Sequence, residues 1–400
     1  MPLSRLYIPV LKDHFSRHRQ MAFLTGPRQV GKTTMAKALA DHYLNYDLTK
    51  DRQAMADPAA WQDGLTQWRS GLPKEPRPIL ALDELHKRSR WKDLLKSVFD
   101  GFEPDLGVLV TGSARLDLLR RGGDSLMGRY FLWHIHPFTA GELLHGRPPA
   151  KLFHAPSLLD EERWQALRRH GGYPEPLTAA NDDFTRQWQQ RRREQLLKED
   201  LRDLTRIRLL DQVERLMLLL DQRSATTLSY SNLAQDLETS PVSVRQWIQA
   251  LLLQHQGFVL TPYTRKIARS LSREPKWYSR DWSSVEDPGQ RFETMVACHL
   301  LKSVDLWTDQ GLGSFKLHYL RNRQHQEVDF LILRDNKPWL LAEAKCSDTK
   351  LSPNLAKFQA VLGAPHAIQV VEDLPFTPLD FERLNRPSAV PARAFLSQLS

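Results

Sequence analysis

Cysteine is nearly absent from this sequence, since Cys298 and Cys346 are the only two among its 400 residues. Two thiols provide neither a disulfide framework nor a cysteine-rich metal cluster. The sequence also has no apolar run of about 18 residues, so we expect no membrane span and no membrane partner. Its first residues have no apolar core of a secretion signal. Cytoplasmic localisation is the resulting expectation.

One sign of charge prevails. There are 56 lysine and arginine residues against 47 aspartate and glutamate residues, which gives a net charge of +9. Such a balance favours an acidic partner, and nucleic acid is the commonest one. A hydrophobic content of 41% permits well-filled cores. The length accommodates about two to four domains.

A phosphate-binding pattern, G-x-x-x-x-G-K-[ST], directly follows the apolar run at residues 21–24. Gly26 and Gly31 allow the loop to turn its N–H groups inward toward an anion. Lys32 adds a positive charge for the β- and γ-phosphates, and Thr33 is placed to bind Mg²⁺. We therefore expect ATP and Mg²⁺ as ligands. The residues expected to contact the nucleotide are Gly26, Pro27, Arg28, Gln29, Val30, Gly31, Lys32, Thr33 and Thr34.

Two more apolar runs end in polar residues that suit the same site. Residues 79–82 lead into Asp83 and Glu84, and residues 106–110 lead toward Ser113. Ligands gather at the carboxyl ends of buried parallel strands. Asp83 is then expected to hold Mg²⁺, and Glu84 to orient the attacking water. Ser113 could contact the γ-phosphate, or cap the helix that follows it.

Residues 226–282 have the pattern of a winged helix. A short amphipathic helix at 230–237 precedes a turn, and Ser240-Pro241 then caps a second helix that runs to about residue 254. Two strands with basic residues between them follow. Polar residues off the apolar face of the second helix could enter a DNA groove, although many winged helices contact only protein. These candidates are Ser243, Arg245, Gln246 and Gln249.

A β-hairpin is predicted near the C-terminal end, with its turn centred on Asn336. In that register Asp329 faces Glu343, and Lys345 shares the face of Glu343 because strand side chains alternate. Two carboxylates and a lysine are the groups that metal-assisted phosphodiester cleavage uses. Asp329 and Glu343 would hold Mg²⁺, and Lys345 would position the nucleophile. An exposed sheet with paired charges is the alternative.

These motifs together resemble a bacterial and archaeal group of AAA+ ATPases with a C-terminal domain of unresolved function. The string GPRQVGKTT, the runs LALDE and VTGS, and residues 126–130 with 136–138 carry the resemblance. It implies homo-oligomers, and it suggests Arg129 as an arginine finger. A salt-bridged surface arginine is the alternative for that residue.

The C-terminal hairpin resembles the PD-(D/E)xK nuclease superfamily, especially its Holliday-junction-resolvase-like members. The helical acid of those proteins corresponds to Glu293 in the segment RFETMV, and Gln359 is a weaker further match. A nuclease-like fold that only binds DNA stays open as an alternative.

The expected architecture is α/β, with a P-loop AAA+ domain, a helical and winged-helix region, and a restriction-endonuclease-like α/β domain. The predicted boundaries are 1–145 for the ATPase core, 146–222 for a helical lid or linker, 223–284 for the winged helix and 285–400 for the nuclease-like domain. The function expected is an ATPase that acts on DNA. A regulatory ATPase with an inert C-terminal domain and a protein-remodelling machine are the alternatives.

Overall fold

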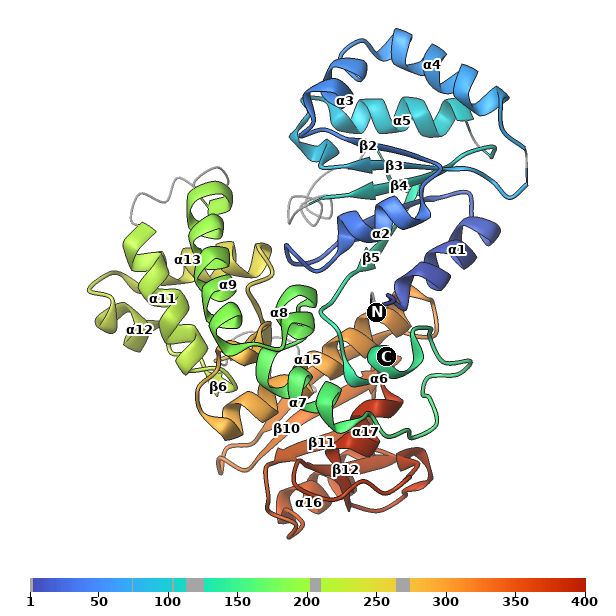
Figure 1. The fold of residues 1–400 in the computed structure, drawn as a ribbon. Coiled ribbons are helices and arrows are strands. Elements are labelled where there is room, and N and C mark those ends of the chain that lie inside the picture. Colours follow the sequence, from blue (N-terminus) through green and yellow to red (C-terminus); the bar gives the residue numbers. More distant parts are fainter. Residues whose placement is uncertain (1–2, 74, 103, 113–125, 202–209, 264–273) are drawn as a thin grey trace. The chain divides into compact units, whose positions relative to one another are not determined.

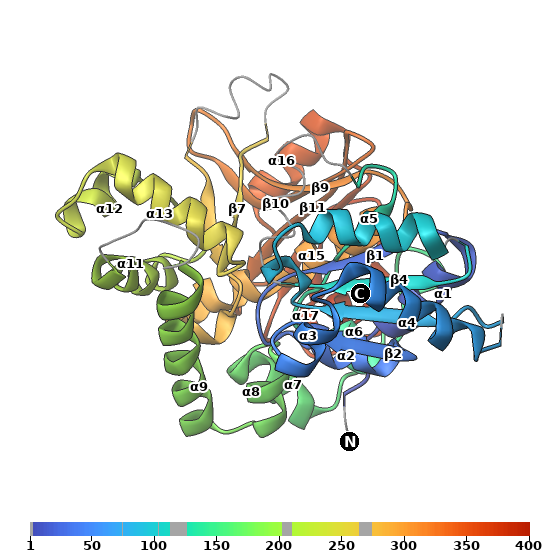
Figure 2. The same ribbon diagram turned by 90° about the horizontal axis from the view of Figure 1, so that it is seen from above.

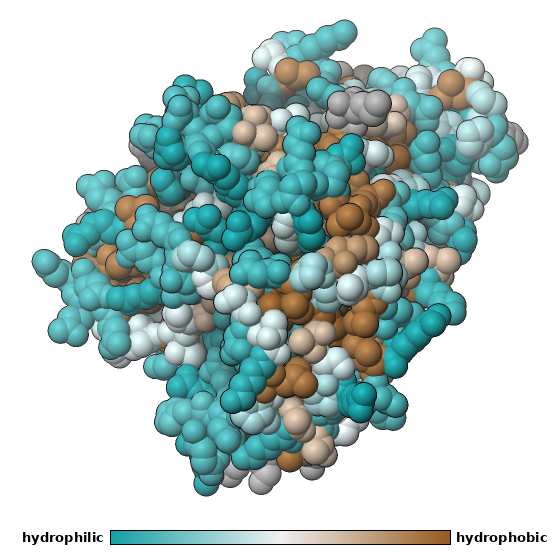
Figure 3. Space-filling view, turned by 60° about the horizontal axis from the view of Figure 1, so that its bottom comes forward, coloured by the Kyte–Doolittle hydropathy of each residue, from teal (hydrophilic) through white to brown (hydrophobic). Residues whose placement is uncertain are grey.

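The computed structural model describes residues 3–73, 75–102, 104–112, 126–201, 210–263 and 274–400. It divides into two compact units, Met1–His136 and Pro137–Ser400. Each unit is described by itself below. Hydrophilic side chains cover most of the face shown in Figure 3. In the described ranges no helix is long and apolar enough to span a membrane.

The first unit is built on a parallel sheet with the strand order β2-β3-β4-β1-β5. Helices α3, α4 and α5 cover one face, and α1 and α2 cover the other (Figure 1). Strands β1, β3 and β4 are buried along their whole length, as their continuous apolar runs predict. The elements are α1 (Tyr7–Arg17), β1 (Met21–Thr25), α2 (Lys32–Leu39), β2 (His42–Asn45), α3 (Thr49–Ala54), α4 (Pro58–Ser70), β3 (Ile79–Asp83), η1 (Leu85–Lys87), α5 (Trp91–Phe102), β4 (Gly107–Thr111) and β5 (Tyr130–His134).

The second unit begins with helices. They are α6 (Ala140–His145), α7 (Glu161–His170), α8 (Pro174–Ala179), α9 (Asp182–Gln195) and the π-helical segment η3 (Leu196–Leu201). A buried ion pair joins α6 to a later helix of the unit, because Lys302 and Glu142 contact each other with both side chains fully buried.

A module of helices and a small antiparallel sheet follows, with the strand order β6-β8-β7. Helices α12 and α13 lie next to each other (Figure 2), and their buried side chains form one core with those of α11. The elements are α11 (Leu210–Gln222), β6 (Thr226–Thr227), α12 (Tyr230–Asp236), α13 (Pro241–Leu253), β7 (Gly257–Leu260), β8 (Lys276–Ser279) and η4 (Trp282–Ser284). The two helices and the strand pair β7–β8 agree with the sequence expectation.

A five-stranded mixed sheet completes the unit, with the order β13-β12-β11-β10-β9. Strands β9, β10 and β11 are antiparallel, and β11, β12 and β13 are parallel. The elements are α15 (Pro288–Asp309), β9 (Phe315–Arg321), β10 (Glu327–Arg334), β11 (Lys337–Lys345), α16 (Pro353–Leu362), β12 (His366–Val371), η5 (Phe381–Arg383), β13 (Ser388–Pro391) and α17 (Ala392–Gln398).

Candidate functional site

The phosphate loop connects β1 to α2, as the sequence predicts. Its backbone needs glycine twice, since φ is +144° at Gly26 and +94° at Gly31. A Cβ atom on Gly26 would lie 2.2 Å from the carbonyl oxygen of Ile135, which is closer than any side chain tolerates. The loop is therefore shaped by close backbone packing as well as by its turn.

Lys32 is buried at the start of α2, and its ammonium group points into the loop. Nζ donates hydrogen bonds to the carbonyl oxygens of Gly26 at 2.8 Å and Pro27 at 2.7 Å. Both acceptors are neutral loop carbonyls, which negatively charged phosphate oxygens can replace with stronger, charge-assisted hydrogen bonds.

Asp83 ends β3 with a buried carboxylate that three hydroxyl groups contact. Thr33 Oγ1 donates to Oδ2 at 2.6 Å, Tyr43 donates to the same oxygen at 2.8 Å, and Thr111 donates to Oδ1. A carboxylate beside a threonine hydroxyl suits Mg²⁺, which prefers oxygen ligands. Tyr43 lies within β2 and Thr111 ends β4, the two strands that flank β3, and neither residue was predicted as part of the site.

Glu84 follows Asp83 and has a left-handed backbone, with φ of +55°. Its Oε2 lies 3.2 Å from Nζ of Lys87, which also pairs with Asp47 at 2.7 Å. The carboxylate is thus held by a nearby cation beside the predicted metal position. Ser113, the third polar residue predicted here, lies outside the described residues.

Arg129 lies just before β5, whose parallel neighbour is β1. Tyr130 pairs with Met21 and His134 with Thr25, so Arg129 lies at the edge of the sheet opposite the phosphate loop. Its Nε donates to Oδ1 of Asp100 at 2.9 Å. The structure therefore does not bring Arg129 to the nucleotide site of its own chain.

The predicted DNA-contacting residues lie on α13. Ser240 accepts a hydrogen bond from the backbone N–H of Ser243 at 3.0 Å, which caps the helix as expected. Arg245, Gln246 and Gln249 are exposed, while Ser243 is half-buried. The guanidinium of Arg245 lies 5.1 Å from the ring centre of Tyr230 on α12. Three of the four candidates are thus accessible on one helix.

The hairpin of β10 and β11 turns at Asp335 and Asn336, whose φ values of +52° and +62° suit a two-residue turn. This turn pairs Arg334 with Lys337, one residue away from the predicted register. An irregularity between Ile332 and Leu333 then restores the predicted register, in which Phe330 pairs with Ala342.

The observed pairing ends at Phe330 and Ala342, one residue before the predicted pair of Asp329 and Glu343. Asp329 Oδ2 accepts a hydrogen bond from the backbone N–H of Ala344 at 3.0 Å. Lys345 Nζ lies 2.9 Å from Glu343 Oε1. Burial raises the pKa of Asp329 well above its ordinary value, the charge of Glu293 raises it further, and Lys276 opposes both. The structure thus brings together four of the predicted residues, whose charges act on one another: Glu293, Asp329, Glu343 and Lys345.

Lys276 is a charged residue of this site that sequence reasoning missed, as is its partner Glu327. It begins β8, and its ammonium lies 3.1 Å from Glu293 Oε1, 2.5 Å from Glu327 Oε1 and 3.7 Å from Asp329 Oδ1. Only the short sequence distance to Glu293 could have suggested the pairing.

The carboxylates do not form a group of metal ligands. Within the described ranges, no three His, Cys, Asp or Glu side chains are arranged to hold a metal ion. The weaker candidate Gln359 donates to the carbonyl oxygens of Ala364 and Pro365, at the end of its own helix.

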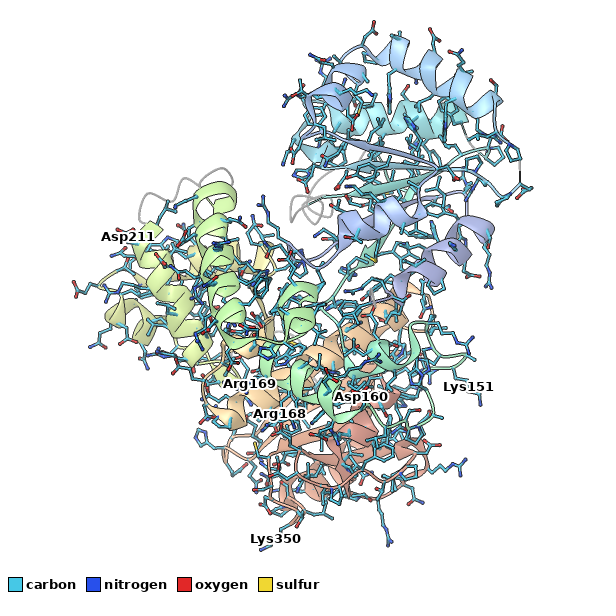
Figure 4. The ribbon with its side chains drawn as sticks, in the orientation of Figure 1. Lys151, Asp160, Arg168, Arg169, Asp211 and Lys350 are labelled. Atoms are coloured by element: carbon cyan, nitrogen blue, oxygen red, sulfur yellow. The ribbon has the colours of Figure 1, made fainter. Side chains whose placement is uncertain are left out.

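A basic pocket of about 320 Å³ also lies in the second unit. Arg168 and Arg169 on α7 are two of its lining residues (Figure 4), and Arg291 on α15 is a third. Arg168 forms an ion pair with Glu372, which also lines the pocket. Three arginines and one acid make this surface positive.

Comparisons with known proteins agree with the geometry of the first unit. Residues 18–144 match the model of a family described as an AAA domain. Residues 161–285 and 288–374 match two families described as domains of unknown function, DUF8612 and DUF4143. The N-terminal part thus has the parallel-sheet α/β fold of a P-loop AAA+ ATPase.

Curated relatives include the uncharacterized protein Rv2008c of Mycobacterium tuberculosis and Mb2031c of Mycobacterium bovis. Each is 26% identical over 354 residues, which cover 84% of this chain and 72% of the relative.

Among solved structures, the Orc1 protein of Aeropyrum pernix in complex with DNA is 14% identical and covers 72% of this chain and 91% of its own, with a TM-score of 0.29. AMPPCP-bound DnaA of Aquifex aeolicus is 14% identical and covers 61% and 86%, with a TM-score of 0.30. Likenesses at this level say nothing about what this chain does.

Proposed function

We propose that this protein binds and hydrolyses ATP with Mg²⁺ and uses the nucleotide state to act on DNA. The observation that carries the ATPase part is the contact of 2.6 Å between Thr33 and Asp83, next to a loop in which Lys32 is already turned toward the phosphate position. Residues from the phosphate loop, α2 and β3 thereby supply the groups that phosphoryl transfer needs.

Each residue then has a definite role. The loop N–H groups and Lys32 bind the β- and γ-phosphates, and Lys32 exchanges its two loop carbonyls for phosphate oxygens. Thr33 and Asp83 would hold Mg²⁺, which would supply charge neutralisation at the phosphate oxygens. Glu84 orients the attacking water once its carboxylate leaves Lys87.

We further propose that residues 223–284 form a winged helix that contacts DNA. The order of one strand, two helices and two strands within these bounds supports this, because a winged helix has a helix-turn-helix followed by a strand pair. The exposed side chains of Arg245, Gln246 and Gln249 on α13 and the net charge of +9 also support it. The basic pocket beside Arg168 is a second candidate for contacts with phosphate groups.

The protein is expected to act as a homo-oligomer. Arg129 lies at the sheet edge opposite the loop of its own chain, so a role as arginine finger requires a neighbouring copy. Its ion pair with Asp100 would then open when the copies assemble.

Cleavage of DNA is a second candidate function. The order and directions of β9 to β13 favour a nuclease-like domain, as do the contacts of Asp329 with the Ala344 backbone and of Glu343 with Lys345. The ammonium of Lys276 within the carboxylates opposes a metal-dependent reaction there. DNA cleavage is therefore less strongly supported than DNA binding.

One experiment separates these functions. The full chain is incubated with branched, single-stranded and double-stranded DNA, with and without ATP and Mg²⁺, and binding, ATP hydrolysis and cleavage are followed. We expect nucleotide-dependent binding that a Lys32→Ala variant loses. Absence of both ATP hydrolysis and DNA binding at moderate salt would contradict the proposal. Cleavage that a Lys345→Ala variant loses, with its ATPase intact, would establish the second function.

A further inference from the structure

Three carboxylates of the second unit surround one ammonium group. Lys276 contacts Glu293 on α15 together with Glu327 and Asp329 on β10, at the distances given above. Its side chain is only 5% exposed. The hydroxyl of Tyr278, two residues further along β8, donates to Glu293 Oε1 at 2.8 Å. We call Lys276, Glu293, Glu327 and Asp329 the lysine cluster.

The ammonium group of this cluster stays charged. Burial alone would lower the pKa of Lys276, but the charges of Glu293, Asp329 and Glu327 outweigh burial and raise it. A buried ion costs several kcal/mol when it has no partner, so the lysine and the carboxylates stabilise one another.

A divalent cation does not fit this arrangement. Mg²⁺ needs oxygen ligands at about 2.1 Å, and its double charge would lie beside an ammonium group that already contacts the same oxygens. The described residues accordingly contain no group of three potential ligands arranged around a metal position.

We propose that Lys276 is the built-in cation of the lysine cluster and excludes divalent metal ions from it. Glu293 on α15 and Asp329 on β10 therefore take no Mg²⁺ while β8 is in place. This inference is independent of ATP hydrolysis in the first unit, and it bears on the cleavage candidate alone.

The position of Lys276 also gives the cluster a structural role. Strand β8 belongs to the small sheet of the helical module, whereas Glu327 and Asp329 belong to the C-terminal sheet. A second link lies alongside, because the hydroxyl of Tyr319 on β9 donates to the carbonyl oxygen of Glu274 at 2.7 Å. The lysine cluster thus joins the two sheets. A movement of β8 that withdrew Lys276 would expose carboxylates able to bind metal.

The test measures Mn²⁺ binding by the full chain without nucleotide. Isothermal titration calorimetry gives the binding, and thermal unfolding gives the stability. All variants carry Asp83→Asn, which removes the carboxylate that would bind metal in the first unit. The parent protein of this test is the chain that carries Asp83→Asn alone, and we expect it to bind no Mn²⁺. Lys276→Met should unfold at a lower temperature without metal, bind one Mn²⁺, and regain several degrees of Tm when it is added. The matched control Lys316→Met removes an exposed lysine from β9 and should behave as the parent does.

Two results would overturn the inference. One is Mn²⁺ binding by the parent protein that disappears on adding Asp329→Asn. The other is a folded Lys276→Met variant that does not bind Mn²⁺. If Lys276→Met does not fold, the titration of the parent protein decides. Mn²⁺ binding that Asp329→Asn abolishes would refute the inference. Absence of such binding would support it. ATP hydrolysis by the chain with Asp83 intact is measured separately, so failure of the ATPase proposal is distinguished from failure here.

Discussion

The hydroxyl of Thr33 donates a hydrogen bond of 2.6 Å to the carboxylate of Asp83, a residue 50 positions later in the chain. This bond joins the start of α2 to the end of β3 across the sheet. Tyr43 and Thr111 hold the same carboxylate from the two neighbouring strands. The carboxylate proposed to hold Mg²⁺ is therefore positioned by four separate segments of the first unit, α2, β2, β3 and β4.

A substitution at Arg129 tests the arginine finger. Arg129→Ala should lower ATP hydrolysis by about 10³-fold if the guanidinium stabilises charge in a neighbouring copy, while nucleotide binding stays unchanged. Asp100→Ala is the matched control, because it removes the ion pair but keeps the guanidinium. If Arg129→Ala and the parent protein hydrolyse ATP at equal rates, Arg129 is not an arginine finger and forms only a surface ion pair with Asp100.

DNA contact by α13 predicts a defined salt dependence. Arg245→Ala should weaken DNA binding at every salt concentration and lower the slope of log K against log salt by about 1, because one phosphate contact is lost. Fluorescence anisotropy with a short duplex measures both quantities. Arg186→Ala, an exposed arginine on α9, is the control and should bind as the parent does. An unchanged slope for Arg245→Ala would argue that this helix contacts protein.

The buried ion pair of the second unit predicts a large loss of stability. Lys302 Nζ also donates to Thr139 Oγ1 at 3.1 Å, and Glu142 shares its fully buried position. Lys302→Met should lower the free energy of unfolding by about 3–5 kcal/mol, because Glu142 loses its buried counter-charge. Arg186→Met breaks an exposed pair with Asp183 and should cost at most about 1 kcal/mol. Urea unfolding of the two variants makes the comparison, and equal losses would contradict it.

Asp221 predicts a pH dependence of stability. Burial raises the pKa of Asp221 to about 6, and the charge of Asp281 adds to the shift. The folded state then keeps a proton that the unfolded state releases above about pH 4, so stability falls as pH rises from about 4 to 6. The free energy of unfolding should fall by about 3 kcal/mol over this pH window.

An Asp221→Asn variant should lack this contribution. Its free energy of unfolding, compared with that of the parent protein, should therefore improve as pH rises through the window. Parallel pH profiles of parent and variant would show that Asp221 does not carry the shifted proton.

The sequence predicted the parts of the sites that local chemistry determines. The loop at Gly26–Thr33 and the cap at Ser240 depend on residues within a few positions of one another, and both form as expected. The hairpin was predicted with its turn one residue off, because periodicity does not reveal the irregularity near Leu333 that restores the register.

The missed residues are those that only tertiary structure brings together. Tyr43 and Thr111 reach the Asp83 carboxylate from β2 and β4, the two parallel strands that flank β3. Lys276 meets Glu327 and Asp329 because the small sheet packs beside the C-terminal one, about 50 residues further along the chain. A lone lysine at the start of a strand has no periodicity that would mark it as the centre of a charge cluster.

Nucleotide binding and turnover test the central claim most directly. The measurement is ATP hydrolysis and equilibrium binding of a fluorescent ATP analogue, for the parent protein, Lys32→Ala and the exposed control Lys50→Ala. We predict Mg²⁺-dependent binding and hydrolysis by the parent and the control, and a loss of about 100-fold or more for Lys32→Ala, since the phosphates lose their charge-assisted contact. Full binding and turnover by Lys32→Ala would contradict the assignment of this loop as the nucleotide site.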